Sequence, residues 1–402
     1  MSGLDGRPRA TEKRGWGGGT ARGGVLGLAG MLAAGLVACS VPYADSKDRA
    51  RPASPSGAPG SRVPVLADAT ATAARPSGDP ATGGPRRATG TPVTIAFGGD
   101  IHFAGAPGAR LATDPATAIG PIASTLSAAD LAIANLETAV TTGGTPAAKE
   151  FTFRAPATAF DALRAAGIDV VTMANNHGMD YGVDGLHDSL RNAAAARFPV
   201  IGIGEDDTGA FTPYRTTVKG QRIAVVGATQ VLDDELAAAW TAGPHKPGLA
   251  SAKQVNRLVA AVRAARVGAD TVIVFLHWGT EQQHCPTATQ QSLVPVLAAA
   301  GADVVVGSHA HVLLGGGWAD SGMYVDYGLG NFVFYSSGNG PNTESGVLRL
   351  TVSGRAVTDA AWVPARIVGG APRPLTGAAA GQALASWNGL RGCTGLRDAM
   401  PR

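Results

Sequence analysis

Short apolar runs and alanine-rich stretches alternate along the chain from residue 93 to residue 306. The apolar runs are rich in valine and isoleucine and are bounded by glycine or polar residues, which is typical of buried strands. The expected strands are residues 93–100, 131–134, 169–174, 271–276 and 303–306, and the expected helices are residues 158–166, 183–196, 251–265 and 287–300. Strands that alternate with helices predict an α/β layered domain.

The pattern changes after residue 311, where helical stretches give way to apolar runs separated by glycines. Residues 323–326, 331–334, 347–352 and 357–363 are expected to form strands. We therefore expect one domain over residues 92–370 with a β-rich C-terminal part. Residues 371–402 are rich in alanine, glycine and arginine and are expected to form a C-terminal tail that is weakly specified except for Trp387 and Cys393.

The first 38 residues have the pattern of an export signal, with basic residues followed by an apolar run from Val25 to Ala38. This run is shorter than the roughly 20 residues of a spanning helix. The segment Leu36-Val-Ala-Cys39 resembles the lipobox of bacterial lipoproteins, in which the cysteine becomes the lipidated first residue. We expect a lipid anchor on Cys39 at the extracytoplasmic face of the membrane. A secretory signal cut after Ala38, which would release the protein, or an uncleaved signal anchor are the alternatives.

Residues 39–91 are mainly alanine, proline, glycine, serine and threonine, so they are expected to form a disordered linker. The whole chain is 45% hydrophobic and 16% charged, which is ordinary for a packed globular protein. Its formal net charge is +3, and residues 1–38 carry five basic against two acidic residues, so the remainder has no net charge. This balance gives no support for a nucleic-acid partner.

Two further cysteines, Cys285 and Cys393, would lie in an oxidising compartment if the chain is exported. A disulfide between them is expected, and it would tie the C-terminal tail to the loop after His277. Two unpaired thiols are the alternative. A zinc site is less favoured because neither cysteine belongs to a CxxC pair.

Residues with metal-ligating side chains follow the five expected strands. The segments are Asp100-Ile-His102, Asn135-Leu-Glu137, Asn175-Asn-His177, His277-Trp-Gly279 and Gly307-Ser-His-Ala-His311. Imidazole, carboxylate and amide groups gathered at strand ends suit two divalent cations. Each segment alone also fits a turn, a cap or a solvated loop, so the prediction of a two-metal site rests on their joint occurrence. Glu281 is expected to orient His277 from behind.

These segments carry a resemblance to a known family. The motifs that carry it are Gly98-Gly-Asp-Ile-His102, Asn135-Leu-Glu137, Ala174-Asn-Asn-His-Gly-Met-Asp-Tyr-Gly182, His277-Trp-Gly-Thr-Glu281, Gly307-Ser-His-Ala-His311 and Tyr327-Gly-Leu-Gly-Asn-Phe-Val-Phe334. In this order they resemble the CapA family of capsule-synthesis proteins, which is linked to poly-γ-glutamate. That family is in turn similar to the calcineurin-like metallophosphatases. The resemblance covers roughly residues 94–367.

The resemblance implies a four-layer α/β/β/α fold and a site for two divalent ions, which could be Mn, Fe, Zn or Co. Asp100, His102 and His311 would hold one ion, Asn176, His277 and His309 would hold the other, and Glu137 would bridge them. Asn135 and Asn331 would support these ligands. His177 would face the substrate as an acid or transition-state stabiliser. Metallophosphatases have an acid after this histidine where the chain has Gly178, which leaves Asp180 as the candidate that orients it.

The resemblance favours a metal-dependent hydrolase or transferase in the synthesis of poly-γ-glutamate or a related envelope polymer. A non-catalytic component of a polymer synthesis and export assembly is the first alternative, and a secreted phosphoesterase or nucleotidase is the second. The expected partners are an anionic polymer or small-molecule substrate and a polymer ligase or export machinery. The sequence does not decide whether phosphorus or carbon would be attacked.

Overall fold

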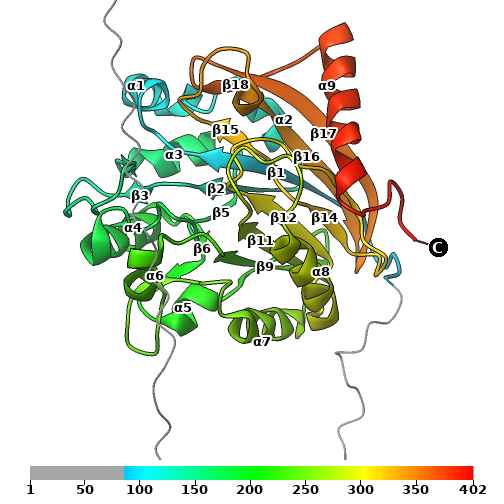
Figure 1. Cartoon of the computed structure of the whole chain (residues 1–402), viewed down its shortest axis with the longest axis horizontal. Coiled ribbons are helices and arrows are strands. Elements are labelled where there is room, and N and C mark those ends of the chain that lie inside the picture. Colours follow the sequence, from blue (N-terminus) through cyan, green and yellow to red (C-terminus); the bar gives the residue numbers. More distant parts are fainter. Residues whose placement is uncertain (1–85, 402) are drawn as a thin grey trace, which may run out of the picture. The chain divides into compact units, whose positions relative to one another are not determined.

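The computed structural model describes residues 86–401, and its larger sheet has eight strands (Figure 1). The strand order is β18-β17-β16-β1-β2-β5-β6, with β15 paired to β1. The strands are β1 (Val93–Ile101), β2 (Leu131–Leu136), β5 (Val170–Thr172), β6 (Val200–Ile201), β15 (Asn331–Val333), β16 (Glu344–Ser353), β17 (Ala356–Val368) and β18 (Ala371–Pro374). The pairings among β15, β1, β2, β5 and β6 are parallel, whereas β16, β17 and β18 pair antiparallel.

A second sheet of six strands has the order β13-β14-β12-β11-β9-β8. Its strands are β8 (Tyr214–Val218), β9 (Gln221–Thr229), β11 (Thr271–His277), β12 (Val304–Ser308), β13 (Gly316–Trp318) and β14 (Tyr324–Asp326). Two short ribbons pair β3 (Ala139–Val140) with β4 (Arg154–Ala155) and β7 (Ile203–Gly204) with β10 (Gly248–Leu249). The inner strands β9, β11, β12 and β14 are parallel, so their carboxyl ends lie at one edge.

The helices pack against the two sheets, most of them on the outer faces. They are α1 (Ala106–Thr113), α2 (Ala123–Ser127), α3 (Thr158–Ala165), α4 (Gly182–Ala196), α5 (Asp207–Phe211), α6 (Asp234–Trp240), α7 (Val255–Arg266), α8 (Ala288–Ala300) and α9 (Gly377–Leu390). One apolar cluster joins α1–α4 to the larger sheet, and another joins α7 and α8 to the smaller sheet (Figure 1). A third cluster lies between the sheets. The arrangement is helices, sheet, sheet, helices.

The alternation of side chains along the central strands explains this layering. In β1, Ile95 and Phe97 belong to the cluster between the sheets, while Ala96 faces the helices. In β11, Phe275 faces the other sheet and Val274 packs toward α7 and α8. Because successive side chains on a strand point to opposite faces, a strand buried on both faces must be apolar throughout. The unbroken apolar runs in the sequence are therefore explained, and the predicted α/β class is confirmed.

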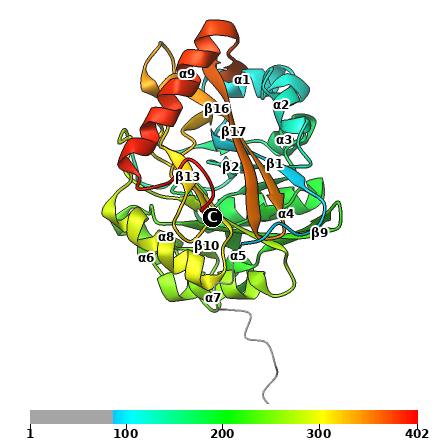
Figure 2. The same ribbon diagram turned by 90° about the vertical axis from the view of Figure 1, so that its right-hand side faces the viewer.

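Ordered structure extends beyond both predicted ends of the domain. Upstream, Arg86 is already buried, and its guanidinium donates to the carbonyl oxygens of Ala302 and Ser321, so the predicted boundary at residue 92 is placed too late. Downstream, residues 371–402 were expected to be weakly specified. The structure instead forms β18 and α9 there, and α9 lies along β17 (Figure 2). The helix was not expected because its sequence is mainly alanine and glycine, and Trp387, one of the two residues excepted from that expectation, supplies its buried contact by stacking on Trp362.

Cys285 and Cys393 form a disulfide, with their Cα atoms 5.7 Å apart, which ties the segment after α9 to the loop after β11. The export signal, Cys39 and most of the expected linker lie outside the described residues. Within the described part, none of the helices has the length and apolar character needed to cross a bilayer.

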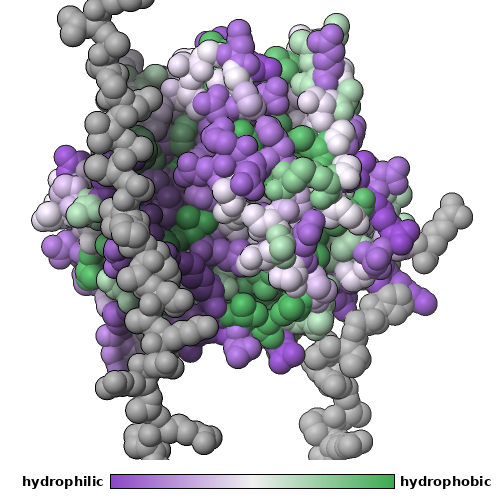
Figure 3. Space-filling model, in the orientation of Figure 1, coloured by the Kyte–Doolittle hydropathy of each residue, from purple (hydrophilic) through white to green (hydrophobic). Residues whose placement is uncertain are grey.

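The surface seen in Figure 3 is mainly hydrophilic, and apolar side chains gather at the lower centre, where Figure 1 draws α7 and α8. Val255 of α7 and Val296 of α8 are both more than one-third exposed.

Strand register brings distant polar residues to one place. Asp100 at the end of β1 is paired with Asn135 of β2 on one side and with Asn331 of β15 on the other. In the second sheet, His277 at the end of β11 is paired with Ser308 of β12. The carboxyl ends of both parallel sets therefore meet where the two sheets face each other, which is where α/β proteins commonly place ligand sites.

Candidate metal centre

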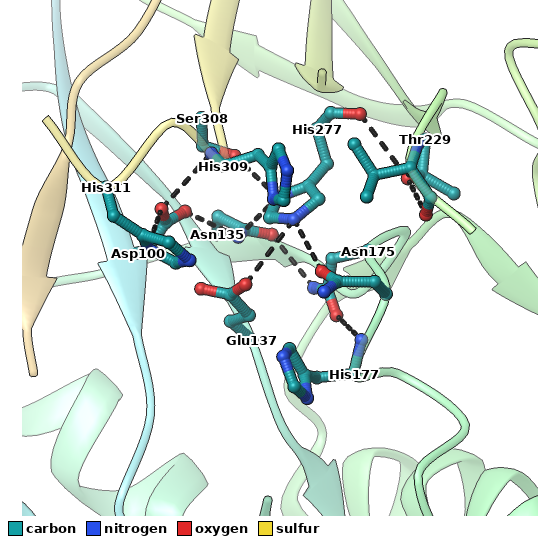
Figure 4. A network of polar contacts seen from close by, with 12 residues as sticks. Asp100, Asn135, Glu137, Asn175, His177, Thr229, His277, Ser308, His309 and His311 are labelled. Carbon is teal, nitrogen blue, oxygen red and sulfur yellow. Dashed lines mark hydrogen bonds and ion pairs between the residues drawn. The ribbon is translucent and has the colours of Figure 1, made fainter. Parts of the chain in front are cut away.

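Asp100 and Asn135 form the base of a buried polar cluster (Figure 4). The Asn135 amide nitrogen donates to Asp100 Oδ1 at 2.8 Å, and the backbone N–H of His309 donates to Asp100 Oδ2 at 3.2 Å. Burial alone would raise the pKa of Asp100. The hydrogen bond with His311, the charges of His277 and His311 and the bond from Asn135 outweigh burial and lower the pKa to about 2.

Glu137 projects into the middle of the cluster from the end of β2 (Figure 4). Its side chain is fully buried, and neither carboxylate oxygen has a hydrogen-bond partner among the described residues. The nearest cationic candidate is His277 Nε2, 3.4 Å from Oε1. A buried carboxylate without donors is costly, so this side chain is placed as a ligand would be.

His277 and Asn176 approach the same point from two different sheets. His277 Nε2 lies 2.8 Å from Asn176 Oδ1. On the other ring nitrogen, Nδ1 lies 3.0 Å from Ser308 Oγ and 3.2 Å from the amide nitrogen of Asn135. To bind a cation through Nε2, the ring would carry its proton on Nδ1, where the Ser308 hydroxyl can accept it.

His309 and His311 follow β12 on a strained turn, since both are non-glycine residues with positive φ, 93° and 56°. Such strain is common at functional sites. The His311 Nδ1 is 2.9 Å from Asn331 Oδ1 and 3.5 Å from Asp100 Oδ2. Because both neighbours are acceptors, Nδ1 carries the proton and Nε2 is left for a ligand.

The pKa values of His309 and His311 are shifted in opposite directions. Burial lowers the pKa of His309 well below its usual value, and the neighbouring charges of His277 and His311 lower it further. Burial also acts to lower the pKa of His311, but the charges of Glu137 and Asp100 and the hydrogen bonds to Asp100 and Asn331 raise it to about 10. Without metal, His309 therefore favours the neutral form and His311 the protonated form, and a cation bound at His311 Nε2 would have to displace the proton from that nitrogen.

His102 lies in the site, but the nitrogen that it turns toward the other expected ligands carries a proton instead of a lone pair. Its ring stacks on Phe153, with centroids 4.4 Å apart, and its Nδ1 accepts a hydrogen bond from the backbone N–H of Ala104 at 3.0 Å. In the neutral ring the proton is therefore on Nε2, and this buried atom has no partner among residues 86–401. Burial, followed by the charges of His177 and His311, lowers the pKa of His102 to about 3.

His177 is in direct contact with Asp180. Its Nδ1 is 2.6 Å from Asp180 Oδ2, and its backbone N–H donates to Asn175 Oδ1 at 3.0 Å. Asn175 in turn donates to Asn135 Oδ1, which connects the His177 loop to the buried cluster (Figure 4). With Nδ1 engaged by a carboxylate, Nε2 is the nitrogen free to exchange a proton.

A cleft of about 230 Å³ opens beside the cluster, and His177 and His311 lie in its wall. Aromatic side chains form much of the remaining surface; they are Phe151, Phe153, Phe334 and Tyr335. Glu281 is the carboxylate residue among the lining residues, and the described part of the chain contributes no lysine or arginine to them. An anionic group bound here would need another source of positive charge.

The arrangement fits two cations that share one ligand. Ligand atoms of Asp100, Glu137 and His311 lie within 4.8 Å of one another, and so do those of Glu137, His277 and His309. Glu137 belongs to both groups, as expected of a bridging residue, and Asn176 joins the second group through His277. Histidine with carboxylate and amide oxygens suits first-row transition metals.

Two expected residues occupy other positions than the sequence suggested. His102 is outside these groups, and its lone pair points to Ala104. Glu281 was expected behind His277, but its carboxylate forms a third group with His309 and His311 at the mouth of the site. Gln282 explains this placement, because its backbone N–H donates to the carbonyl of Ala310 between the two histidines.

Sequence reasoning missed Phe153 and Lys149, which lie on the segment between β3 and β4. Phe153 packs between the rings of His102 and His177, at 4.4 and 4.3 Å. Lys149 contacts the backbone of Asn176 and the carboxylate of Asp180. Neither follows a strand, and neither has metal-ligating chemistry, so no local signal distinguished them from ordinary loop residues.

Two solved structures match this chain in part, both with low TM-scores. A phosphatase from Mycoplasma pneumoniae is 14% identical and aligns with 69% of this chain and 94% of its own, with a TM-score of 0.43. A putative 5'-nucleotidase from Staphylococcus aureus is 15% identical and aligns with 74% of this chain and 58% of its own, also with a TM-score of 0.43.

Curated relatives are more similar in sequence. The capsule biosynthesis protein CapA of Bacillus anthracis is 33% identical over 225 residues, which are 54% of this chain and 52% of the relative. The PGA biosynthesis protein CapA of Bacillus subtilis is 35% identical over 174 residues, 43% of this chain and 44% of the relative. The chain thus spans about half the length of the curated relatives that it matches.

The sequence profile of one protein family, described as bacterial capsule synthesis protein PGA_cap, matches residues 94–336. This match covers more than half of the chain and includes every proposed ligand, from Asp100 on β1 to His311 after β12, together with Asn331. The chain belongs to the PGA_cap family of bacterial capsule synthesis proteins.

Proposed function

We propose that this protein is a metal-dependent hydrolase or transferase that acts in the synthesis of poly-γ-glutamate or a related cell-envelope polymer. The observation that supports the proposal best is Glu137, a fully buried carboxylate without a hydrogen-bond donor, shared by two groups of ligand atoms. Burying an ionised carboxylate in this way is costly, and cations bound beside it would offset that cost. The CapA relatives, named for capsule and PGA biosynthesis, supply the polymer class.

One ion would be held by Asp100 and His311, the other by Asn176, His277 and His309, and Glu137 would contact both. When bound, such a pair of ions supplies Lewis acidity and an activated water. His102 directs its Nε2 proton into the site and would hydrogen-bond an oxygen of the substrate or of a reaction intermediate.

His177 would give a proton to the leaving group or take one from the attacking group. Asp180 holds its Nδ1, so Nε2 faces the reacting atoms across the cleft. The aromatic residues Phe153 and Phe334 line the same cleft and give it an apolar wall. Because no lysine or arginine of the described chain lines the cleft, the ions themselves would balance an anionic γ-glutamyl or phosphoryl group.

Metal content and turnover test the proposal together. The full chain, freed of metal and then reconstituted, should bind about two divalent ions. A screen on γ-glutamyl peptides and on phosphoesters identifies the bond that is cleaved. His177→Ala should retain both ions and lose about 10²- to 10⁴-fold in turnover. His187→Ala, a change at a partly exposed histidine paired with Glu205, serves as the matched control and should keep both properties.

Three outcomes separate the readings. A chain that binds no divalent ion would contradict the enzyme proposal. A chain that binds two ions and turns over none of the substrates would support a non-catalytic part in a polymer synthesis and export assembly. Cleavage of phosphoesters alone would support a phosphoesterase.

Anchoring at the extracytoplasmic membrane face through Cys39 is a further part of the proposal, supported by the Leu36-Val-Ala-Cys39 pattern. Mass spectrometry of the mature N-terminus should find a lipidated cysteine. A Cys39→Ala protein that remains membrane-bound would contradict the lipid anchor. From this location the protein would act beside a polymer ligase or exporter, which crosslinking in intact membranes would detect.

A further inference from the structure

Lys149 lies directly behind two functional residues of the candidate site. Its Nζ donates to the backbone carbonyl of Asn176 at 2.6 Å and lies 3.2 Å from Asp180 Oδ1. The side chain is only 10% exposed. Its other neighbours are Asp233 Oδ2 at 3.3 Å and the face of Trp240, whose centroid is 5.3 Å away.

The segment that carries Lys149 is fastened to the same loop at both ends. The backbone N–H of Ala147 donates to the carbonyl of Asp180 at 2.8 Å, and that of Phe153 donates to Asp180 Oδ2 at 2.6 Å. Residues 147–153 therefore form a strap over residues 176–180. Lys149 is the point at which this strap reaches Asn176.

Within the 176–180 loop, the two carboxylate oxygens of Asp180 have different partners, and so do the side-chain and main-chain oxygens of Asn176. Asp180 Oδ2 accepts a hydrogen bond from the Phe153 N–H and contacts His177 Nδ1. Its other oxygen, Oδ1, faces the Lys149 ammonium. Asn176 offers its side-chain oxygen to His277 and its main-chain oxygen to Lys149. One ammonium thus fixes the main chain that aims the amide ligand and also balances the carboxylate that orients His177.

We propose that Lys149 is a positioning residue that couples one metal ligand, Asn176, to the proton-transfer residue, His177, through a single buried ammonium. A buried ammonium without carboxylates is costly, and here two carboxylates and an aromatic face compensate it. Lys149 does not touch substrate or metal. It acts by holding the 176–180 loop at the distance from β11 that lets Asn176 and His277 meet.

The first test needs no metal, so it is independent of the proposed function. Lys149→Met keeps the length of the side chain and removes the charge and the donors. Hydrogen exchange of the full chain should show about tenfold faster exchange at the amides of His177 and Asp180, because their loop loses a tether. Amides of β11 should exchange as in the wild type. Unchanged exchange in the loop would overturn the proposal, and so would uniform acceleration throughout the domain.

The second test uses Mn²⁺ as the probe. If wild type binds two ions, Lys149→Met should weaken the ion held by Asn176 about 10- to 100-fold, the usual effect of losing an outer support, and leave the Asp100–His311 ion within twofold. Electron paramagnetic resonance should change from a coupled pair to a single ion at intermediate Mn²⁺. Equal weakening of both ions, or of neither, would contradict a specific link to Asn176.

Two matched variants sharpen both tests. Asp233→Asn removes the outer, 41% exposed partner of Lys149 and leaves the contacts to Asn176 and Asp180, so exchange and Mn²⁺ binding should stay within twofold of wild type. Lys149→Arg retains the charge and should recover part of the loss. A wild type that binds no Mn²⁺ contradicts the proposed function, and the exchange experiment then decides on Lys149 alone.

Discussion

Two buried carboxylates in this domain are treated in opposite ways. Asp303, at the start of β12, is surrounded by three guanidinium groups: Arg355 Nε lies 2.9 Å from Oδ1, Arg266 contacts Oδ2 and Arg86 Nε is 3.6 Å from Oδ1. The backbone N–H of Val272 adds a fourth contact. Glu137, at the end of β2, is equally buried and has no donor in the described part of the chain.

This difference indicates a structural role for the buried charge of Asp303 and a functional role for that of Glu137. Three arginines compensate Asp303, and they join the segment before β1, the end of α7 and the β16–β17 turn to the second sheet. Among the described residues, Glu137 has no hydrogen-bond donor and no arginine or lysine partner, and its charged neighbours are the histidines His277 and His311. A buried carboxylate without a donor is a candidate to be compensated by divalent cations that it would share with these histidines.

The largest effect is expected at the compensated carboxylate. Asp303→Asn leaves three guanidinium groups without their counter-charge, so the free energy of unfolding should fall by about 3–5 kcal/mol. Urea denaturation of the full chain measures it. Asp270→Asn, at the exposed pair with Arg222, is the control and should change little. If both variants lost the same free energy of unfolding, the three arginines would not depend specifically on the charge of Asp303.

A smaller, metal-dependent effect is expected at Glu137, the carboxylate without a hydrogen-bond donor. Without metal, Glu137→Gln should unfold within about 1 kcal/mol of wild type, because no hydrogen bond is lost. Divalent metal at 100 times its dissociation constant should stabilise wild type by about 2.7 kcal/mol for each bound ion and should stabilise Glu137→Gln far less. Thermal denaturation with chelator and with Mn²⁺ compares the four cases. Equal stabilisation of both proteins would remove Glu137 from the ligand set.

The smallest effect is a pH dependence at His311. Its pKa is raised to about 10 in the folded, metal-free protein, so its contribution to stability is complete below pH 6.5 and is lost as the pH rises toward 10. Because His311 lines the cleft, solvent screening should limit the loss to about 1–2 kcal/mol. Urea denaturation in chelator at pH 6 and pH 10 should show this loss for wild type but not for His311→Gln. Parallel curves would contradict it.

The sequence was informative wherever chemistry and strand position coincide. Asp100, His277 and His309 each follow an apolar run, and the structure brings them together because parallel strands end at a common edge. Asp180 lies three positions after His177 in one tight loop, and its Oδ2 is 2.6 Å from His177 Nδ1. Local spacing is sufficient to predict such contacts.

Residues whose role depends on long-range contacts were not predictable in this way. Lys149 and Phe153 reach the site from a segment with no regular period, and Arg86 meets Asp303 across 217 positions of the chain, in a region whose composition resembles a linker. Glu281 was assigned to the wrong neighbour because a loop can fold toward either side of its strand. The bond from Gln282 to Ala310 decides between them.

By itself the sequence determined the α/β class, the strands that carry the site and the types of ligand, because strand periodicity and side-chain chemistry are local properties. The tertiary structure decided which ligands share Glu137, that His102 presents a proton rather than a lone pair, and that a lysine holds the 176–180 loop. These features depend on distances between residues and on burial. They exist only after the two sheets have packed, because packing removes water from Glu137 and brings together side chains that are far apart along the chain.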